Sequence, residues 1–226
     1  MFDRIAHRYD LLNRVLSLGL DGHWRRRLVQ TLACKSDDAV LDVATGTADV
    51  ALAICRKYPM VRVTGLDPSE RMLAIGREKA RAAGCAQRVD TVTGDAQHMP
   101  FADNTFDASC ISFGIRNVTD RDAGLREMAR VTKPGGRLAI LELSPPQDGS
   151  LRHLASFHIR QVVPRFGAML SGEREYRYLA ESVAAFPPPD AFAQQLLAAG
   201  WRDVGAQRLS FGVVYLHWGV APGNTA

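Results

Sequence analysis

Two strand-like runs that each end in an acid constrain the fold of this chain more than any other feature. The run AVLDVATGTAD, from Ala39 to Asp49, contains a strand, a Gly-containing turn and the start of a helix, and the next apolar run ends at Asp67. This order of strand, turn, helix and acid-terminated strand is typical of a nucleotide-binding α/β unit. We therefore expect a parallel sheet whose ligand lies beyond the carboxyl ends of the strands.

The turn favours S-adenosylmethionine over a dinucleotide as that ligand. A dinucleotide fingerprint needs three glycines so that backbone can approach a pyrophosphate, and the equivalent residues here are Gly46, Ala48 and Ala51. Asp42 would repel phosphates but suits a cationic amino-acid ligand, directly or through water. Asp67 suits either ligand as an acceptor for ribose hydroxyls, and it also fits a helix cap before Pro68.

Composition bounds the class of protein. The chain has 226 residues, 46% of them hydrophobic, which is enough for one well-buried core, so we expect a single domain over residues 1–226. The net charge of +4 permits nucleic acid or anionic lipid as a partner, but the basic residues are spread along the chain. The four cysteines lie far apart without a CxxC pair, which predicts reduced thiols and no metal site. Without a leader or a long apolar run, a cytoplasmic protein is expected.

Short β-rich runs alternate with longer helical patterns along the chain. Strands are expected at residues 39–43, 61–66, 89–93, 106–112, 137–143, 201–209 and 211–220. Helices are expected at residues 49–58, 69–83, 120–131 and 189–199, the third capped by Thr119, with a stop and turn at residues 133–136. The last two strands follow each other too closely to be parallel. The pattern predicts an α/β fold of the class I S-adenosylmethionine-dependent methyltransferase type, Rossmann-like, with a mainly parallel seven-stranded sheet, an antiparallel terminal hairpin and helices on both faces.

Two segments fall outside this predicted core. Residues 1–32 form an N-terminal helical lid in this interpretation, because an apolar stripe there carries the polar tips of Tyr9 and Asn13 on one face. Residues 144–188 form a helical insertion on the substrate or membrane side, with an apolar face and separate basic residues. Ordinary core-facing helices would produce similar patterns, so both alternatives stay open.

Residues that follow the first three strands are the candidates for cofactor binding, because ligands of open parallel sheets lie at strand ends. Asp95 is placed to accept a hydrogen bond from an adenine amino group, although an acid after glycine is also common in turns. With Ser112 from the fourth strand, the predicted cofactor site comprises Asp42, Ala44, Gly46, Thr47, Asp67, Asp95, Ala96 and Ser112.

The fourth strand end, SFGIRN, is where methyl transfer should occur. It lacks the Asn/Asp-Pro-Pro-aromatic motif of amino-directed nucleic-acid methyltransferases and a Pro-Cys nucleophile, which disfavours nucleic acid as substrate. Arg116 and Asn117 are the polar groups available there. Arg116 is suited to steadying a phenolate or a water but not to direct base catalysis, because its pKa is too high. A surface ion pair with Asp120 is the structural alternative for Arg116.

The chain resembles the ubiquinone/menaquinone biosynthesis C-methyltransferase family, or UbiE family. The specific blocks are MFDRIAHRYDLLNRVLSLGLDGHW from Met1 and MPFADNTFDASCISFGIRNVTD from Met99. RVTKPGGRLAILEL from Arg130 and EREYRYLAESVAAFP from Glu173 extend the match to nearly the whole chain. The family usually has Gly where this chain has Ala48, and often His where it has Asp21, which could instead cap a helix.

The resemblance implies methyl transfer from S-adenosylmethionine to a ring carbon of a polyprenylated hydroquinone, yielding S-adenosylhomocysteine and menaquinol or a ubiquinol precursor. It implies roles for Arg116, Asn117, Tyr9 and Asn13 in holding the ring and stabilising its phenolate, with no metal. It also implies a cytoplasmic protein with transient contact at the inner face of the membrane, and leaves a homodimer open. Other lipid or phenolic acceptors, a non-catalytic cofactor-binding regulator and an NAD-dependent oxidoreductase remain alternatives.

Overall fold

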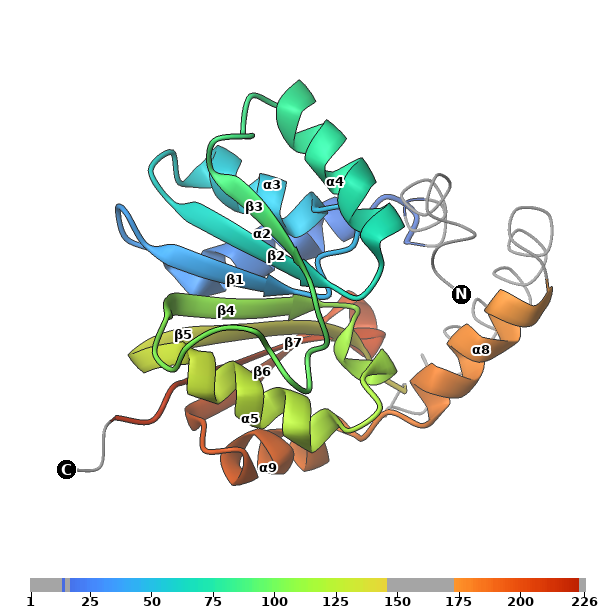
Figure 1. Ribbon diagram of the computed structural model, residues 1–226. Helices are drawn as coiled ribbons and strands as arrows, with labels where there is room; N and C mark the ends of the chain where they lie inside the picture. The colour runs from blue at the N-terminus through green and yellow to red at the C-terminus, as the bar shows by residue number, and fades with distance from the viewer. Residues whose placement is uncertain (1–13, 15–16, 146–172, 224–226) are drawn as a thin grey trace.

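The computed structural model describes residue 14 and residues 17–145 and 173–223, and within these ranges seven strands form one sheet. The strand order is β3-β2-β1-β4-β5-β7-β6 (Figure 1). The strand bounds are β1 Ala39–Val43, β2 Arg62–Asp67, β3 Val89–Thr93, β4 Phe106–Ser112, β5 Thr132–Leu143, β6 Arg202–Leu209 and β7 Val214–Val220.

The sheet is mainly parallel. Strands β1 to β5 pair in parallel, whereas β7 pairs antiparallel with both β5 and β6. The strand order reverses between β1 and β4, which creates the crevice where open α/β sheets bind ligands. The predicted seven-stranded sheet with an antiparallel terminal hairpin is therefore confirmed.

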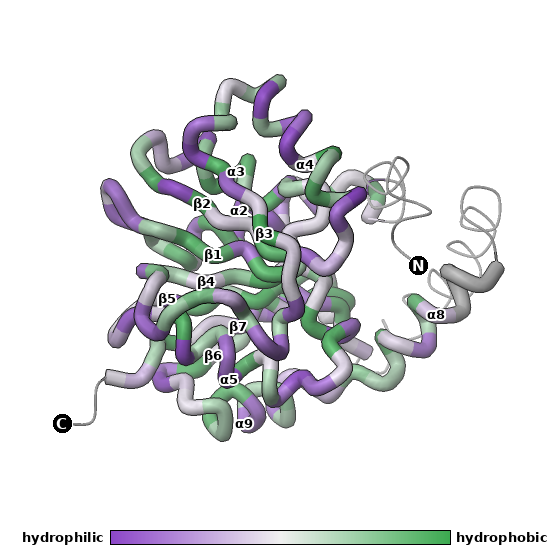
Figure 2. Tube along the Cα trace, in the orientation of Figure 1, coloured by the Kyte–Doolittle hydropathy of each residue, from purple (hydrophilic) through white to green (hydrophobic). Residues whose placement is uncertain are grey.

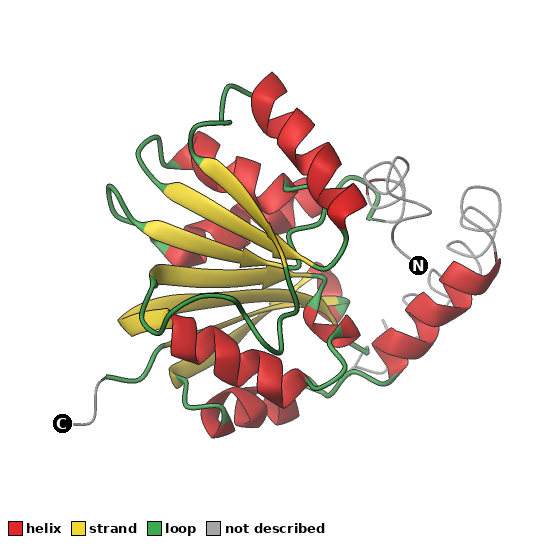
Figure 3. Cartoon of the chain, viewed as in Figure 1, coloured by secondary structure: helices red, strands yellow, loops and turns green. Residues whose placement is uncertain are grey.

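Helices cover both faces of the sheet (Figures 1 and 3). On one face lie α2, α3 and α4, and on the other lie α5 and α9, while α8 extends beside the carboxyl ends of the strands. The bounds are α2 Asp21–Leu32, α3 Asp49–Lys57, α4 Glu70–Ala82, α5 Arg121–Val131, α8 Glu173–Ala184 and α9 Pro189–Ala198, with short 3-10 turns η1 Ile115–Asn117 and η3 Ser210–Gly212.

The core has two halves, one on each face of the sheet. Alternate residues of the central strands point to opposite faces, so Val40 packs with α2 and α3 while Leu41 packs with α5 and α9. Hydrophobic residues concentrate in these central strands (Figure 2). Ionisable side chains are buried in the strands as well, among them Asp42, Glu142 and His217. The functional site draws on the first two.

Three local predictions were wrong at helix and strand ends. The predicted stop and turn at residues 133–136 lies inside β5, because the β4–β5 ladder accommodates it as an irregularity with Gly135 at φ 76°. Helix α5 is capped by Asp120, whose carboxylate accepts the amide hydrogen of Ala123 at 2.9 Å, rather than by Thr119. At α2 the cap position is Leu20, and Asp21 instead pairs with Arg25 at 2.7 Å.

Only part of the predicted N-terminal lid, residues 1–32, lies among the described residues. Helix α2 packs on the sheet through buried Trp24, Leu28 and Leu32, so this part belongs to the core. Tyr9, Asn13 and the apolar face at residues 151–163 lie outside the described residues, and the lid and membrane-side insertion stay predictions. All four cysteines are free thiols, as expected.

Candidate functional site

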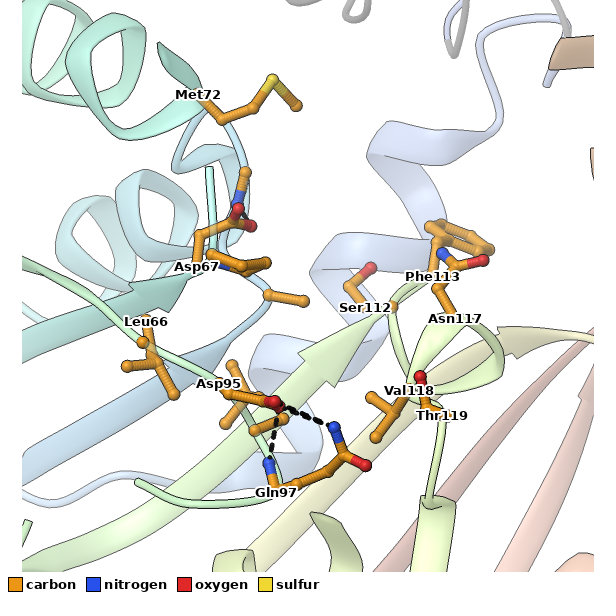
Figure 4. A pocket seen from close by; sticks show the side chains of 17 residues that line it. Leu66, Asp67, Met72, Asp95, Gln97, Ser112, Phe113, Asn117, Val118 and Thr119 are labelled. Atoms are coloured by element: carbon orange, nitrogen blue, oxygen red, sulfur yellow. Dashed lines mark hydrogen bonds between the residues drawn. The ribbon is translucent and has the colours of Figure 1, made fainter. Parts of the chain in front are cut away.

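A cavity of about 290 Å³ lies at the crevice between β1 and β4 (Figure 4). One wall carries Asp67 and Met72, and the facing wall carries Ser112, Phe113 and Asn117. Its lining residues include two acids and no Lys or Arg. They are Val43, Ala44, Gly46, Leu66, Asp67, Pro68, Met72, Gly94, Asp95, Ala96, Gln97, Ser112, Phe113, Gly114, Asn117, Val118 and Thr119.

In the loop after β1, every second residue has a left-handed backbone conformation. Ala44, Gly46 and Ala48 have φ values of 50°, 55° and 64°. Glycine adopts this conformation without strain, whereas alanine costs on the order of 1 kcal/mol there. Ala48 lies close to Gly76 of α4, because a Cβ added to Gly76 would meet the Ala48 Cβ at 3.0 Å. The loop is thus held tightly between β1 and α4.

Asp67 fixes this loop from the end of β2. Its Oδ2 accepts the amide hydrogen of Gly46 at 2.9 Å, and its Oδ1 accepts that of Ser69 at 2.9 Å. Ser69 in turn caps α4 by accepting from the Met72 amide at 3.2 Å. Helix capping therefore falls to Ser69, while Asp67 joins the loop to the helix and borders the cavity.

Asp42 lies beneath the loop and does not line the cavity. Its carboxylate accepts a hydrogen bond from Thr45 Oγ1 at 2.7 Å and contacts Cys110 Sγ at 3.5 Å. Burial raises the pKa of Asp42 to about 6. Thr47 is also buried outside the cavity lining, with Lys79 Nζ donating to its hydroxyl at 3.1 Å. Both residues support the loop from below.

Asp95 borders the opposite end of the cavity. Gln97 donates to its carboxylate from the backbone at 2.9 Å and from the side chain at 2.9 and 3.0 Å. These hydrogen bonds lower the pKa of Asp95, which keeps it an anionic acceptor at neutral pH. Ala96 lies beside it in the lining.

The residues after β4 form the second wall. Phe113 has φ 56°, an unfavourable conformation for an aromatic residue, and its ring makes an edge contact with Trp24 at 6.0 Å between centroids. The Ser112 hydroxyl is buried at the cavity and has no hydrogen-bond partner among the described residues. A bound ligand with a polar group would satisfy that oxygen.

Arg116 turns away from the cavity and forms a buried ion pair. Its Nη1 donates to Glu142 Oε1 at 2.6 Å and to the Phe113 carbonyl at 2.8 Å, and the Arg116 amide donates to Glu142 Oε2 at 3.3 Å. The side chain of Arg116 is 9% exposed and that of Glu142 is fully buried. The predicted alternative partner, Asp120, is thus replaced by Glu142, which the sequence reading missed.

Asn117 is held from the other side by α8. Tyr178 Oη donates to Asn117 Oδ1 at 3.2 Å, which fixes the orientation of the Asn117 side chain at the cavity wall. Tyr178 lies 61 residues further along the chain. The only sequence signal for it was its position within the block EREYRYLAESVAAFP.

The cavity brings together seven of the predicted site residues: Ala44, Gly46, Asp67, Asp95, Ala96, Ser112 and Asn117. Asp42, Thr47 and Arg116 lie in the layer behind it, and Tyr9 and Asn13 are outside the described residues. No group of three potential metal ligands occurs in the part of the chain that the structure describes. Two acids without a basic residue suit a cationic ligand bearing ribose and adenine better than a pyrophosphate.

Comparisons with known proteins place the chain among methyltransferases. The model of the ubiE/COQ5 methyltransferase family matches residues 1–221. The "Ubiquinone/menaquinone biosynthesis C-methyltransferase UbiE" of Geotalea daltonii is 43% identical over 97% of this chain and 94% of its own length. The "Demethylmenaquinone methyltransferase" of Thermus thermophilus is 45% identical over 98% of this chain and 100% of its own length.

Solved structures support the fold. A putative S-adenosylmethionine-dependent methyltransferase from Methanococcus maripaludis superposes with a TM-score of 0.72 at 15% identity, covering 99% of this chain and 94% of the other. A methyltransferase from Aquifex aeolicus gives a TM-score of 0.61 at 19% identity, covering 87% and 89%. The class I methyltransferase fold predicted from the sequence is confirmed.

Proposed function

The chain belongs to the ubiE/COQ5 methyltransferase family, and we propose that it methylates a ring carbon of a polyprenylated hydroquinone, with demethylmenaquinol as the acceptor. As a member it is an S-adenosylmethionine-dependent C-methyltransferase of ubiquinone and menaquinone biosynthesis. The observation that carries the proposal is the cavity, where two acids face a wall ending in Ser112 and Asn117.

The residues present fit S-adenosylmethionine. Asp67 offers carboxylate oxygens for ribose hydroxyls, and Asp95 with the Ala96 backbone suits an adenine amino group. The unpartnered Ser112 hydroxyl needs a polar partner that the described protein does not supply. When bound, the cofactor supplies an electrophilic methyl group on a sulfonium and leaves as S-adenosylhomocysteine. Asp42 acts behind the site by fixing the turn through Thr45.

The chain's own contribution at the acceptor is to place the ring and favour its phenolate. A ring carbon beside a hydroxyl becomes more nucleophilic when that hydroxyl loses its proton. Asn117 at the cavity wall provides a hydrogen-bonding group, and Arg116 fixes the same loop from behind the wall through its bonds to Glu142 and to the Phe113 carbonyl. Glu142 holds Arg116 in place, so it is a positioning residue in this scheme. Tyr9 and Asn13 complete the acceptor side in the proposal.

A naphthoquinol is the favoured ring. Two relatives at 45% identity, from Thermus thermophilus and Deinococcus radiodurans, bear the name demethylmenaquinone methyltransferase. The difference from a benzoquinol is a fused apolar ring, which a hydrophobic pocket discriminates only modestly. Turnover on both rings is therefore compatible with the proposal, with the naphthoquinol preferred.

The cellular setting follows from the acceptor. A polyprenyl tail keeps the quinol in lipid, so we place the protein in the cytoplasm with transient contact at the inner face of the membrane, without nucleic acid as a partner. None of the helices among the described residues is long and apolar enough to span a bilayer. A homodimer is compatible with this arrangement.

The test is methyl transfer from labelled S-adenosylmethionine to reduced demethylmenaquinol and, in parallel, to a short-chain ubiquinol precursor. We expect turnover on the naphthoquinol and its loss in the double variant Arg116→Met with Glu142→Leu, which removes both charges of the buried ion pair together, with cofactor binding retained. Cofactor binding without turnover on either quinol would refute the proposal and favour another acceptor or a regulatory role. Turnover only on the benzoquinol would reverse the ring preference.

A further inference from the structure

Three large apolar side chains are exposed near the carboxyl ends of the parallel strands, the end of the sheet that carries the cavity. Leu18 is 72% exposed, Leu20 45% and Phe211 72%. Because β7 runs antiparallel to β5, the η3 turn before β7 lies beside the carboxyl end of β5, where the Ser144 amide donates to the Val213 carbonyl at 3.0 Å. We call Leu18, Leu20 and Phe211 the rim.

Two segments far apart in sequence are joined at the rim. Trp24 Nε1 of α2 donates to Ser210 Oγ of η3 at 2.8 Å. Leu20 lies one helical turn before Trp24, with the Trp24 amide donating to its carbonyl at 3.1 Å, and Phe211 directly follows Ser210. The Trp24 ring also contacts Phe113 of the cavity wall. The rim therefore lies next to the site where the acceptor ring is expected.

The backbone holds the rim outward in an unfavourable conformation. Leu18 has φ 52°, and Ser210 and Phe211 have φ values of 44° and 58°. Bulky residues seldom adopt positive φ, and such strain gathers at functional positions. By contrast, Met60, which is 60% exposed, lies in the turn before β2 at the opposite edge of the sheet.

The segments that carry the rim are basic. Residues 14–34 contain four arginines and one acid, Asp21, and Arg25 pairs with Asp21 at 2.7 Å and with Asp49 of α3 at 3.1 Å. Residues 202–220, from the start of β6 to the end of β7, contain Arg202, Arg208 and one acid, Asp203. Exposed apolar side chains on segments with more basic than acidic residues complement the surface of an anionic lipid bilayer.

We propose that the rim inserts into the headgroup region of an anionic bilayer and brings the acceptor side of the cavity to the lipid surface. A polyprenyl quinol would then reach the site without its tail entering water, which would cost free energy for every methylene exposed. This inference rests on the proposed quinol acceptor. It goes further by naming the surface that contacts the membrane.

The binding test uses the full chain with vesicles of phosphatidylcholine alone or with one-quarter phosphatidylglycerol, measured by co-sedimentation. The variant is Leu18→Asn with Phe211→Asn, because asparagine removes the apolar group and tolerates positive φ, so the fold is not strained further. Met60→Asn is the matched control. We expect wild type to bind the anionic vesicles, with the rim variant at least about tenfold weaker, the control unchanged and high salt weakening binding.

Turnover separates this inference from the proposed function. The rim variant should keep wild-type turnover on a one-isoprene quinol in buffer and lose most of its turnover on a long-chain quinol in vesicles. Equal vesicle binding by wild type and rim variant, or equal loss in Met60→Asn, would overturn the rim proposal. Absence of wild-type turnover on both quinols would refute the proposed acceptor, while vesicle binding would still decide whether the rim binds lipid.

Discussion

The cofactor side and the acceptor side of the cavity are built in different ways. On the cofactor side, Asp67 and Gly46 lie 21 residues apart, and consecutive strands, turns and helices supply the groups. On the acceptor side, Glu142 reaches back 26 residues to hold Arg116, and Tyr178 reaches back 61 residues to hold Asn117. The groups on the cofactor side are therefore visible in the sequence as residues at successive strand ends, whereas the side-chain pairs on the acceptor side are not visible there.

This difference has a functional consequence. A locally encoded cofactor turn can be kept while the acceptor side changes, which is how one fold serves many methyl acceptors. In this chain the acceptor loop is held by side chains of β5 and α8 as well as by the bond from Arg116 to the Phe113 carbonyl. Substitutions in those two elements should therefore alter acceptor turnover more than cofactor affinity.

The largest effect is expected from Glu142→Ala. It leaves the buried Arg116 guanidinium without its carboxylate, and breaking a buried ion pair in this way costs about 3–5 kcal/mol. Urea unfolding should show this loss, together with turnover reduced at least a hundredfold. In the double variant Arg116→Met with Glu142→Leu, much of the stability should return while activity stays lost. Stability close to wild type in Glu142→Ala would contradict a tertiary origin for the acceptor loop.

The stability of the protein should depend on pH through two buried groups that lie on opposite faces of the sheet. Asp42 has its pKa raised from 3.8 to about 6, so the stability it contributes is present below pH 4 and is lost as the pH rises through 6. His217, buried on the other face, has its pKa lowered from 6.5 to about 4, so its contribution is present above pH 6.5 and lost as the pH falls through 4. Each contribution is about 3 kcal/mol, and the two oppose each other.

Single substitutions should expose this compensation. In Asp42→Asn, the free energy of unfolding should rise with pH between 4 and 6.5, and in His217→Gln it should fall over the same range. Urea titrations at several pH values measure both slopes. The double variant should have a flatter profile than either single one, and unchanged slopes in both single variants would contradict the role of these buried groups.

The cofactor side of the cavity could be predicted from the sequence better than the acceptor side. The strand ends and the acids Asp67 and Asp95 were predictable, because apolar runs define strands and parallel strands end at one edge. Glu142 stands within an apolar β5 run, and a lone acid there is the signal that was available for it. Nothing local pairs it with Arg116, since that contact depends on how β4 and β5 align.

The positive φ angles in the site loops could not be predicted from the sequence pattern either. The left-handed conformations of Ala44 and Phe113 go against the preference of their residue types, and tertiary contacts impose them. The carbonyl of Phe113, for example, accepts a hydrogen bond from Arg116 Nη1 at 2.8 Å, and the Phe113 ring contacts Trp24. The pairing of Asn117 with Tyr178 likewise needed the position of α8, which no residue near Asn117 indicates.

A moderate effect is expected from Tyr178→Phe, which removes one hydrogen bond to the Asn117 amide. A loss of about 1 kcal/mol corresponds to roughly fivefold in kcat/KM for the quinol. Cofactor Kd should stay at the wild-type value, because Tyr178 is not part of the cavity lining. If Tyr178 acts through Asn117, the double variant with Asn117→Ala should be no worse than Asn117→Ala alone. Additive losses, or a weaker cofactor Kd in Tyr178→Phe, would mean that the two sides are not separable.

The smallest effect is expected from Ala48→Gly on the cofactor side. Ala48 has φ 64°, so glycine relieves strain of about 1 kcal/mol in the folded state. Glycine also gains conformational freedom in the unfolded chain, which offsets about 0.4–1 kcal/mol. Net stability by urea unfolding should therefore change by less than about 1 kcal/mol, and cofactor affinity by calorimetry should rise no more than about fivefold.

Gly76→Ala is the matched test of the same contact, because its new Cβ would lie 3.0 Å from that of Ala48 and should weaken cofactor binding. In combination with Ala48→Gly part of that loss should disappear, because the methyl at 3.0 Å is then absent while the Thr47 backbone still lies 3.3 Å from the new Cβ, and wild-type cofactor binding in Gly76→Ala alone would show that the turn is not held by its contact with α4.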